Sequence, residues 1–194
     1  QQFGGILNGK KVWLKAFNEY SMVKIVLTGA ESTGKSVLSQ HLAKHYNAIV
    51  IPELARTYVE NLKRHYTYND VEKIARLQVE KEQGINSNES MVFFDTWLII
   101  TKVWLDFVFG KSPDWLKHHI LASKIDLFLV CDIDIPWEPD PVRENGGETR
   151  KLLQQIYINE LRSFGFTYEI VSGKGIERTQ NAINIVDRFL SASR

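Results

Sequence analysis

Apolar residues along this chain fall into short continuous runs, separated by longer stretches in which they recur every three or four positions. The runs predict five strands, at Val23–Thr28, Ala48–Ile51, Met91–Asp95, Leu127–Asp132 and Thr167–Val171. Four of these runs are nearly continuous in apolar residues, which is typical of parallel strands that are covered on both faces. The pattern therefore predicts a buried parallel sheet.

Helical periodicity fills the stretches between the predicted strands. It covers residues 36–46, 70–83, 97–109 and 176–190, and Asn69 with Glu72 forms a capping-box signature at the start of the second stretch. Strands and helices that alternate at this spacing imply right-handed crossovers and one α/β domain, which we place at residues 22–194.

Residues 1–21 do not fit this alternation. Met22 immediately precedes the first strand and is a candidate natural start. We therefore interpret residues 1–21 as an N-terminal extension: a tag, a linker or the tail of an upstream segment. Lys10, Lys11 and Lys15 interrupt any apolar core there, which argues against a signal peptide.

The charge balance argues against a nucleic-acid binder. The chain has 24 basic and 23 acidic side chains and a formal net charge of +1, without the one-sided basic stripe of such proteins. No apolar stretch reaches the roughly 18 residues that a membrane span needs. The single cysteine, Cys131, excludes an internal disulfide and lies in an apolar run as a buried filler, so we expect a cytoplasmic protein.

The sequence Gly29-x-x-x-x-Gly34-Lys35-Ser36 matches the phosphate-loop (P-loop) pattern in full, with a predicted strand before it and a predicted helix after it. In such a loop successive backbone N–H groups face a phosphate, and the helix N-terminus adds positive potential. Lys35 can reach the β- and γ-phosphate oxygens, and Ser36 can ligate Mg²⁺. The predicted ATP-binding set here is Gly29, Glu31, Ser32, Thr33, Gly34, Lys35, Ser36 and Val37. Residues 67–70 and 124–127 do not satisfy the guanine-recognition motif, which argues against a GTPase.

Two carboxylates follow strands at the edge where parallel sheets carry out chemistry. Glu53 comes after the strand at 48–51, and Asp95 ends the strand at 91–95. One acid can serve Mg²⁺ while the other holds or deprotonates an acceptor hydroxyl, but the sequence does not assign the two roles. Helix capping is the alternative for each carboxylate. Arg56, one helical turn after Glu53, can orient that carboxylate, contact the phosphate or form a surface ion pair.

Residues 136–150 form the one break rich in glycine, proline and charge, and we predict that they are a lid. Arg143 and Arg150 can deliver charge to a transferring phosphoryl group, with Gly146 and Gly147 as hinges. Solvated loop arginines are the alternative. A lid that closes and expels water limits wasteful hydrolysis in small-molecule kinases.

Aromatic residues near these segments are candidates for a flat substrate ring. Trp137 can stack on such a ring, and Tyr58, Trp97 and Trp104 can line the same cleft. Aromatic residues at helical spacing are more often core, so Trp104 is assigned mainly to packing.

Several strings together resemble one family. The segments VLTGAESTGKSVLSQHLAKHY, IPELARTYVE, FFDTWLIITKVWLDFVFG, DLFLVCDIDIPWEPDPVRE and GKGIER are similar to the NadR-type ribosylnicotinamide kinase domain of the P-loop superfamily. The resemblance covers residues 22–190. It implies a P-loop kinase fold, an α/β three-layer sandwich with a five-stranded parallel sheet and an arginine-bearing lid.

The resemblance also implies a reaction: the ATP-dependent phosphorylation of the 5′-hydroxyl of nicotinamide riboside, which gives nicotinamide mononucleotide. Position by position, it places ATP phosphates on Gly29–Ser36, Mg²⁺ on Ser36 and Asp95, the riboside at Glu53 and Arg56, and nicotinamide near Trp137. The predicted catalytic residues are then Lys35, Glu53, Asp95, Arg143 and Arg150, and the loop Gly173–Arg178 approaches adenine.

Two departures from the family pattern matter. No His-x-Gly-His motif of an adenylyltransferase and no DNA-binding domain occur in these 194 residues, so we expect them neither to make NAD nor to repress transcription. Trp97 stands where a smaller or polar residue is expected and can reshape the acceptor pocket. Three hypotheses therefore stay open: a nicotinamide riboside kinase, a kinase of another nucleoside or small metabolite, and an ATP-binding regulatory module.

Overall fold

The computed structural model of the chain describes residues 5–7, 10–12 and 22–192. Before the main domain, β1 (Gly5–Leu7) and β2 (Lys10–Val12) pair in antiparallel orientation. The interpretation of residues 1–21 as an extension otherwise lies outside the described residues.

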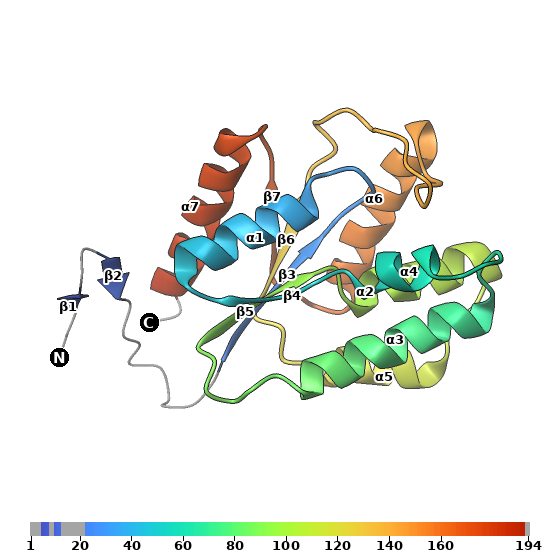
Figure 1. Cartoon of the computed structure of the whole chain (residues 1–194), viewed down its shortest axis with the longest axis horizontal. Helices are drawn as coiled ribbons and strands as arrows, with labels where there is room; N and C mark the ends of the chain where they lie inside the picture. Colours follow the sequence, from blue (N-terminus) through green and yellow to red (C-terminus); the bar gives the residue numbers. More distant parts are fainter. Residues whose placement is uncertain (1–4, 8–9, 13–21, 193–194) are drawn as a thin grey trace.

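The main domain is built on a five-stranded parallel sheet (Figure 1). Its strands are β3 (Val23–Thr28), β4 (Ile49–Ile51), β5 (Met91–Asp95), β6 (Leu127–Cys131) and β7 (Tyr168–Val171). Their order across the sheet is β4-β5-β3-β6-β7, and each neighbouring pair is parallel. The predicted α/β class, the five strands and their parallel pairing are confirmed.

Helices cover both faces of the sheet, which makes three layers (Figure 1). On one face α1 (Lys35–Tyr46) and α7 (Ile176–Ala192) pack over a core that includes Ile25 and Leu27. On the other face α3 (Tyr68–Gln83), α4 (Leu98–Phe109), α5 (Asp114–Ala122) and α6 (Gly147–Ser163) pack over Val26 and Phe94. Because side chains alternate along a strand, burial of both sets explains why the central strands read as unbroken apolar runs.

The four predicted helices agree with α1, α3, α4 and α7 to within two residues at each end. The predicted capping box, however, is wrong. Helix α3 begins after Thr67, and the reciprocal pair is Thr67 with Asp70, because Glu72 instead accepts hydrogen bonds from Arg76 and Trp115. No helix in the described residues is both long and apolar enough to cross a membrane.

Three helices were not predicted: α2 (Leu54–Glu60), α5 and α6. Helix α6 matters most for the site, because it begins at Gly147 and therefore takes Arg150 out of the predicted lid. The irregular part of the lid, which we call the lid segment, is residues 136–146. It connects the carboxyl end of β6 to α6.

Candidate active site

The loop between β3 and α1 has the backbone conformation of an anion-binding turn. Gly29 and Gly34 have φ angles of +124° and +76°, and Ser32 lies in the left-handed region at +58°. A Cβ atom at Gly29 would lie 2.6 Å from the carbonyl oxygen of Cys131 on the neighbouring strand. Glycine is therefore required at position 29 both for its φ angle and for the close approach of two strands.

The carbonyl and amide groups of this loop are used in opposite ways. Side chains, or the first turn of α1, donate a hydrogen bond to every carbonyl oxygen from Gly29 to Gly34. By contrast, the N–H groups of residues 31–34 have no acceptor among the residues that the structure describes. Buried or half-buried N–H groups are normally paired. A run of free donors at a helix N-terminus is thus a site for an anion.

Lys35 lies at the entrance of α1, and its ammonium group folds back over the loop. Lys35 Nζ is 3.0 Å from the carbonyl oxygen of Gly29 and 2.8 Å from that of Ala30. No carboxylate within residues 22–192 pairs with it at ion-pair distance. Its positive charge is therefore available to a phosphate group that enters the loop.

Arg150 and Arg178 do not lie where the sequence placed them. Only 7% of Arg150 and 5% of Arg178 is exposed, and both guanidinium groups donate to backbone carbonyl oxygens. The prediction of Arg150 as a mobile lid residue is wrong because it belongs to α6. Arg178 likewise lies beneath the loop, where it also pairs with Asp134, and the approach of the loop Gly173–Arg178 to adenine stays a prediction.

Glu53 and Asp95 meet at the carboxyl edge of the sheet, next to Lys35. Burial raises the pKa of Asp95, and this outweighs the hydrogen bond from Ser36 and the positive charges of Lys35 and Arg56. Burial also raises the pKa of Glu53; Lys35 and Arg56 act against this, whereas the Asp95 carboxylate adds to it. Carboxylates held near each other in a partly dry site resist joint ionisation. A raised pKa brings such a group closer to the range of a general base.

Neither carboxylate caps a helix. Glu53 occupies the N-cap position of α2, but its side chain makes no capping hydrogen bond, and Trp97, not Asp95, is at the N-cap of α4. Asp95 is 3% exposed, and its Oδ1 atom has no hydrogen-bond partner. The next residue, Thr96, is held at a φ of +65° while its N–H donates to the carbonyl of Leu27. Such strain in a β-branched residue is characteristic of functional turns.

Ser36 and Asp95 have the chemistry of a Mg²⁺ site. A hydroxyl and a carboxylate are hard oxygen donors, and the Asp95 oxygen without a partner is free to accept a metal or its water. Elsewhere in residues 22–192 no group of three or more His, Cys, Asp or Glu is arranged to hold a metal. One or two protein oxygens suit Mg²⁺, which shares its coordination with phosphates and water.

The lid segment is tied to α2 through Asp140. Asp140 Oδ2 accepts from Arg56 Nη2 at 2.8 Å and pairs with Arg143 Nε at 2.9 Å. Arg143 also donates to the carbonyl of Glu138 at 2.6 Å, and its Nη1 lies 3.5 Å from the Ser32 hydroxyl. Arg143 is therefore placed above the phosphate loop.

A second tie runs from the loop itself to the lid segment. The Glu31 carboxylate accepts hydrogen bonds from the backbone N–H and the side-chain amide of Asn145, at 3.0 and 2.9 Å. Tyr66, before α3, donates to Glu144 at 2.8 Å. The Glu31 side chain therefore binds the lid segment, in addition to the backbone role that the sequence predicts for Glu31 in the phosphate loop.

The aromatic residues that were predicted near the cleft have different surroundings in the structure. Trp97 is 1% exposed in the core, and its Nε1 donates to Glu82, so the prediction that it lines the cleft is wrong. Trp104 packs edge-on against Tyr66, as its assignment to packing anticipated. Tyr58 donates to Asp70 at the start of α3 and thereby joins two helices.

Trp137 remains a candidate for contact with a flat ring. Its Nε1 is buried without a partner, and its indole lies directly beneath Gly146, where a Cβ would come within 3.3 Å of the ring. A side chain at position 146 would therefore push the indole aside by a few tenths of an ångström.

Two site residues on α6 were missed by the sequence. Gln154 accepts from the Ala30 N–H at 2.9 Å and donates to the carbonyl of Cys131 at 3.0 Å, which locks the loop to β6. Tyr157 is buried close enough to Glu31 and Glu53 that, after burial itself, their charges raise its pKa. The sequence pattern did not identify either residue, because the helix that carries both of them was not predicted.

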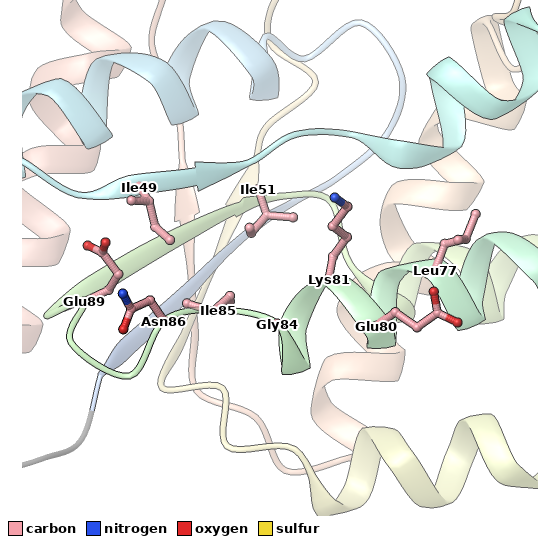
Figure 2. Close-up of a pocket in the computed structure, with 9 residues that line it drawn as sticks. All are labelled: Ile49, Ile51, Leu77, Glu80, Lys81, Gly84, Ile85, Asn86 and Glu89. Carbon is pink, nitrogen blue, oxygen red and sulfur yellow. The ribbon is translucent and has the colours of Figure 1, made fainter.

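A separate hollow of about 470 Å³ lies between the edge strand β4 and the end of α3 (Figure 2). The side chains of Ile49, Ile51 and Ile85 surround it, with Lys81 and Glu89 at its margins. Its lining includes none of the predicted site residues. The chemistry predicted from the sequence therefore belongs to the P-loop edge and not to this hollow.

Comparison with known proteins agrees with this fold and site. A family model described as an AAA domain matches residues 24–178. The trifunctional NAD biosynthesis/regulator protein NadR of Salmonella typhimurium is 25% identical over 144 residues, which cover 71% of this chain and 35% of the relative. NadR of Escherichia coli is 25% identical over 143 residues, with the same coverage. The chain thus spans about a third of the length of these relatives, and the predicted resemblance to NadR is confirmed.

Solved structures show the same architecture. NadR in complex with NAD and AMP-PNP aligns with a TM-score of 0.70 at 25% identity, covering 87% of this chain and 49% of that one. NadR in complex with NR aligns at 0.72 and 24% identity over the same shares. Thymidylate kinase from Ehrlichia chaffeensis aligns at 0.65 and 13% identity, covering 85% and 98%, and shows the fold alone. The chain therefore shares its fold with P-loop kinases.

Proposed function

Because this chain belongs to the AAA domain family of P-loop proteins and is related to NadR, we propose that it is an ATP-dependent kinase of nicotinamide riboside. The reaction transfers the γ-phosphoryl group of ATP to the 5′-hydroxyl of the riboside and gives ADP and nicotinamide mononucleotide. The observation that carries the proposal is the placement of two carboxylates, Glu53 and Asp95, beside Lys35 of the phosphate loop. An ATP-binding sensor needs no carboxylate for an acceptor hydroxyl.

The residues divide the work as follows. The free N–H groups of residues 31–34 bind the phosphates, and Lys35 moves from the carbonyls of Gly29 and Ala30 onto the β- and γ-phosphate oxygens. Ser36 and Asp95 would hold Mg²⁺, and the ion would supply positive charge that neutralises the phosphates. Arg143, above the loop, stabilises negative charge on the transferring group.

Glu53 is the general base in this proposal. As the 5′-oxygen bonds to the γ-phosphorus and the bond to the β,γ-bridging oxygen breaks, the hydroxyl proton passes to the Glu53 carboxylate and then to solvent. Glu53 suits this step because its pKa is raised, mainly by burial, and because its side chain is not occupied in helix capping. Arg56, 3.9 Å from Glu53 Oε2, orients the carboxylate.

The acidic side chains of the cleft support a cationic acceptor. The carboxylates of Glu31 and Asp95 both act on Glu53, and Lys35 and Arg56 offset part of this negative charge. The nicotinamide ring of the riboside carries a positive charge, which these carboxylates attract, and a neutral nucleoside lacks this attraction. Trp137, with its buried and unpaired Nε1, is the ring contact that we assign to nicotinamide.

A panel of acceptors tests the proposal. The protein is incubated with Mg-ATP and, separately, nicotinamide riboside, uridine, deoxyadenosine and thymidine monophosphate, while ADP release and product mass are followed. We expect ADP release that depends on nicotinamide riboside and a product heavier by one phosphate. A different acceptor that is clearly preferred would replace the substrate but keep the kinase, and turnover independent of every acceptor would favour a regulatory module.

A further inference from the structure

The phosphate loop is held from behind by two buried arginines that come from different helices. Arg150 lies in α6, and Arg178 lies in α7, far apart along the chain. Between them they donate to the carbonyl oxygens of Glu31, Ser32 and Thr33, three consecutive residues of the loop. These are the residues whose N–H groups have no acceptor in the described part of the chain.

Arg150 spans two of the three carbonyls with one guanidinium plane. Its Nε and Nη2 atoms lie 3.0 Å from the carbonyl oxygens of Glu31 and Ser32, and its Nη1 lies 2.9 Å from that of Ile135, directly before the lid segment. A planar fork of fixed geometry is required to reach three oxygens at once. Lysine, a single ammonium on a flexible stem, cannot reproduce this arrangement.

Arg178 holds the third carbonyl and anchors it to the edge of the sheet. Its Nη1 is 3.0 Å from the carbonyl oxygen of Thr33, and its Nε is 2.7 Å from that of Gly173. Its Nη2 reaches the carbonyl of Asp132 at 3.2 Å and also the carboxylate of Asp134. The loop is thereby joined to the segments that follow β6 and β7.

The direction of these carbonyls decides what the loop presents to an anion. In a peptide unit the carbonyl and the N–H point in opposite directions, so a flip of the unit that follows Ser32 would replace an N–H donor with an oxygen. Ser32 is a non-glycine residue held at a φ of +58°, a conformation that persists only when its surroundings impose it. The arginine contacts on either side of it supply that constraint.

The charges in this region are not fully balanced, which fits a site that receives a polyanion. Burial lowers the pKa of the Arg150 guanidinium, and the nearby positive charges of Arg178 and Arg143 lower it further, while Asp132 and Asp134 act in the opposite direction. Guanidinium groups this close repel one another unless negative charge is near.

We propose that Arg150 and Arg178 are positioning residues, which fix the carbonyls of Glu31, Ser32 and Thr33 away from the phosphate so that the loop N–H groups face it. The inference rests on the proposed function only in taking the anion to be the phosphate chain of a nucleotide. It does not depend on the acceptor. Neither arginine touches the phosphate directly.

Binding of inorganic tripolyphosphate, measured by calorimetry on the full chain, tests this role without a nucleoside. The variants are Arg150→Lys, Arg150→Gln and Arg178→Lys, each assayed at a temperature where thermal melting shows it folded. We expect each variant to bind tripolyphosphate about 10- to 100-fold more weakly, because charge-assisted hydrogen bonds that orient the loop are lost. The KM for ATP should rise in parallel, while the KM for the acceptor stays unchanged.

Lys102→Met is the matched control. Lys102 is also a buried cation, but it pairs with Asp106 and Glu160 between α4 and α6, away from the loop. We expect this variant to lose thermal stability yet keep its affinity for tripolyphosphate. Bound tripolyphosphate should slow hydrogen exchange of the amides of residues 31–34 in the wild type and in Lys102→Met, and slow it less in the Arg150 and Arg178 variants.

The two lysine variants separate position from charge. Wild-type affinity in Arg150→Lys, with a loss only in Arg150→Gln, would mean that charge alone matters and would overturn the proposal. Unchanged affinity in folded Arg150→Lys and Arg178→Lys would overturn it as well. Tripolyphosphate binding by the wild type without turnover of nicotinamide riboside would instead remove only the proposed acceptor.

Discussion

Arg56 and Asp140 lie 84 positions apart in the chain, yet Arg56 Nη2 is 2.8 Å from Asp140 Oδ2. This pair joins α2, which begins next to Glu53, to the lid segment. Partial burial raises the pKa of Asp140, but the hydrogen bonds from Arg56 and Val142 and the charges of both arginines outweigh it, so the pKa is lowered overall. The tie is therefore present at neutral pH and is lost as the pH falls through this depressed pKa.

Asp140→Asn tests the tie between α2 and the lid segment. The substitution keeps the shape of the side chain but removes the charge that holds Arg56 and Arg143. We expect the KM for the acceptor to rise by about fivefold, corresponding to roughly 1 kcal/mol for a partly exposed ion pair. Hydrolysis of ATP without an acceptor should increase, because a looser lid admits water.

The matched control is Glu60→Gln, which removes a more exposed acidic partner of Arg56, one that lies on α2 with it and not in the lid segment. It should leave both quantities unchanged. If both variants change the KM and the ATP hydrolysis equally, the effect comes from the loss of any negative charge near Arg56 and not from the tie to the lid segment.

Lys35→Ala tests the phosphate loop. The loss of the ammonium group should lower kcat by at least about 100-fold, because the lysine charge stabilises the transition state more than it stabilises the bound substrate. The fold should persist, because Lys35 contacts only backbone carbonyls within its own loop. Turnover measured beside a circular dichroism melt checks both points, with exposed Lys44→Ala on the same helix as the control.

The sequence predicted those parts of the site that depend on local pattern. The P-loop residues form an unbroken motif between a strand and a helix, and Glu53 and Asp95 follow strands, so their shared edge could be deduced from the topology of parallel sheets. A buried strand is also easy to recognise, since both of its faces are apolar.

The remaining features depend on contacts that are distant in sequence. Arg150 looked like a lid residue because the polar start of α6 resembles a loop, and only the fold shows its guanidinium beneath the P-loop. Trp97 lies only two residues after Asp95, but the left-handed backbone at Thr96 between them directs its side chain into the core. Gln154 contacts a loop more than a hundred residues away. Local periodicity carries no information about such pairs.

Glu53→Gln tests the assignment of the general base. We expect kcat to fall by about 10²- to 10⁴-fold while ATP affinity changes little, since the amide cannot accept the proton. In the wild type, kcat should decrease as the pH falls through the pKa of Glu53, which lies above its ordinary value because of burial. This acidic limb should disappear in Glu53→Gln. A pH profile of the same shape in the variant would assign the limb, and the base, to another group.

Gly29→Ala tests the close approach of the P-loop to β6. The new Cβ would lie 2.6 Å from the Cys131 carbonyl oxygen, at a φ of +124°. We expect a loss of about 3 kcal/mol in the free energy of unfolding, from backbone strain and overlap together. Gly110→Ala is the matched control, because its φ is +72° but no atom lies within 4 Å of the new Cβ. Strain alone should cost it about 1 kcal/mol. Denaturant unfolding measures both values, and equal losses would mean that the contact with Cys131 relaxes freely.

Asp95→Asn tests the cost of holding a carboxylate ready for Mg²⁺. The pKa of Asp95 is raised in the folded protein, chiefly by burial, so the folded state binds a proton more tightly than the unfolded state does. The stability due to this difference is present at acidic pH and is lost as the pH rises through the folded-state pKa. At neutral pH the ionised carboxylate therefore lowers the free energy of unfolding relative to a neutral side chain.

We accordingly expect Asp95→Asn to melt at a higher temperature than the wild type at pH 7 to 8, and the difference to shrink as the pH approaches 4. Each kcal/mol recovered should raise Tm by about 2–4 °C in a domain of this size. The same variant should lose most of its Mg²⁺-dependent turnover, because the charge that the metal requires is the charge that destabilises the fold. Asp126→Asn, at an exposed position on the opposite edge of the sheet, serves as the control and should show no such gain. If Asp95→Asn is less stable than the wild type at pH 8, the carboxylate holds the fold together rather than waiting for a metal ion.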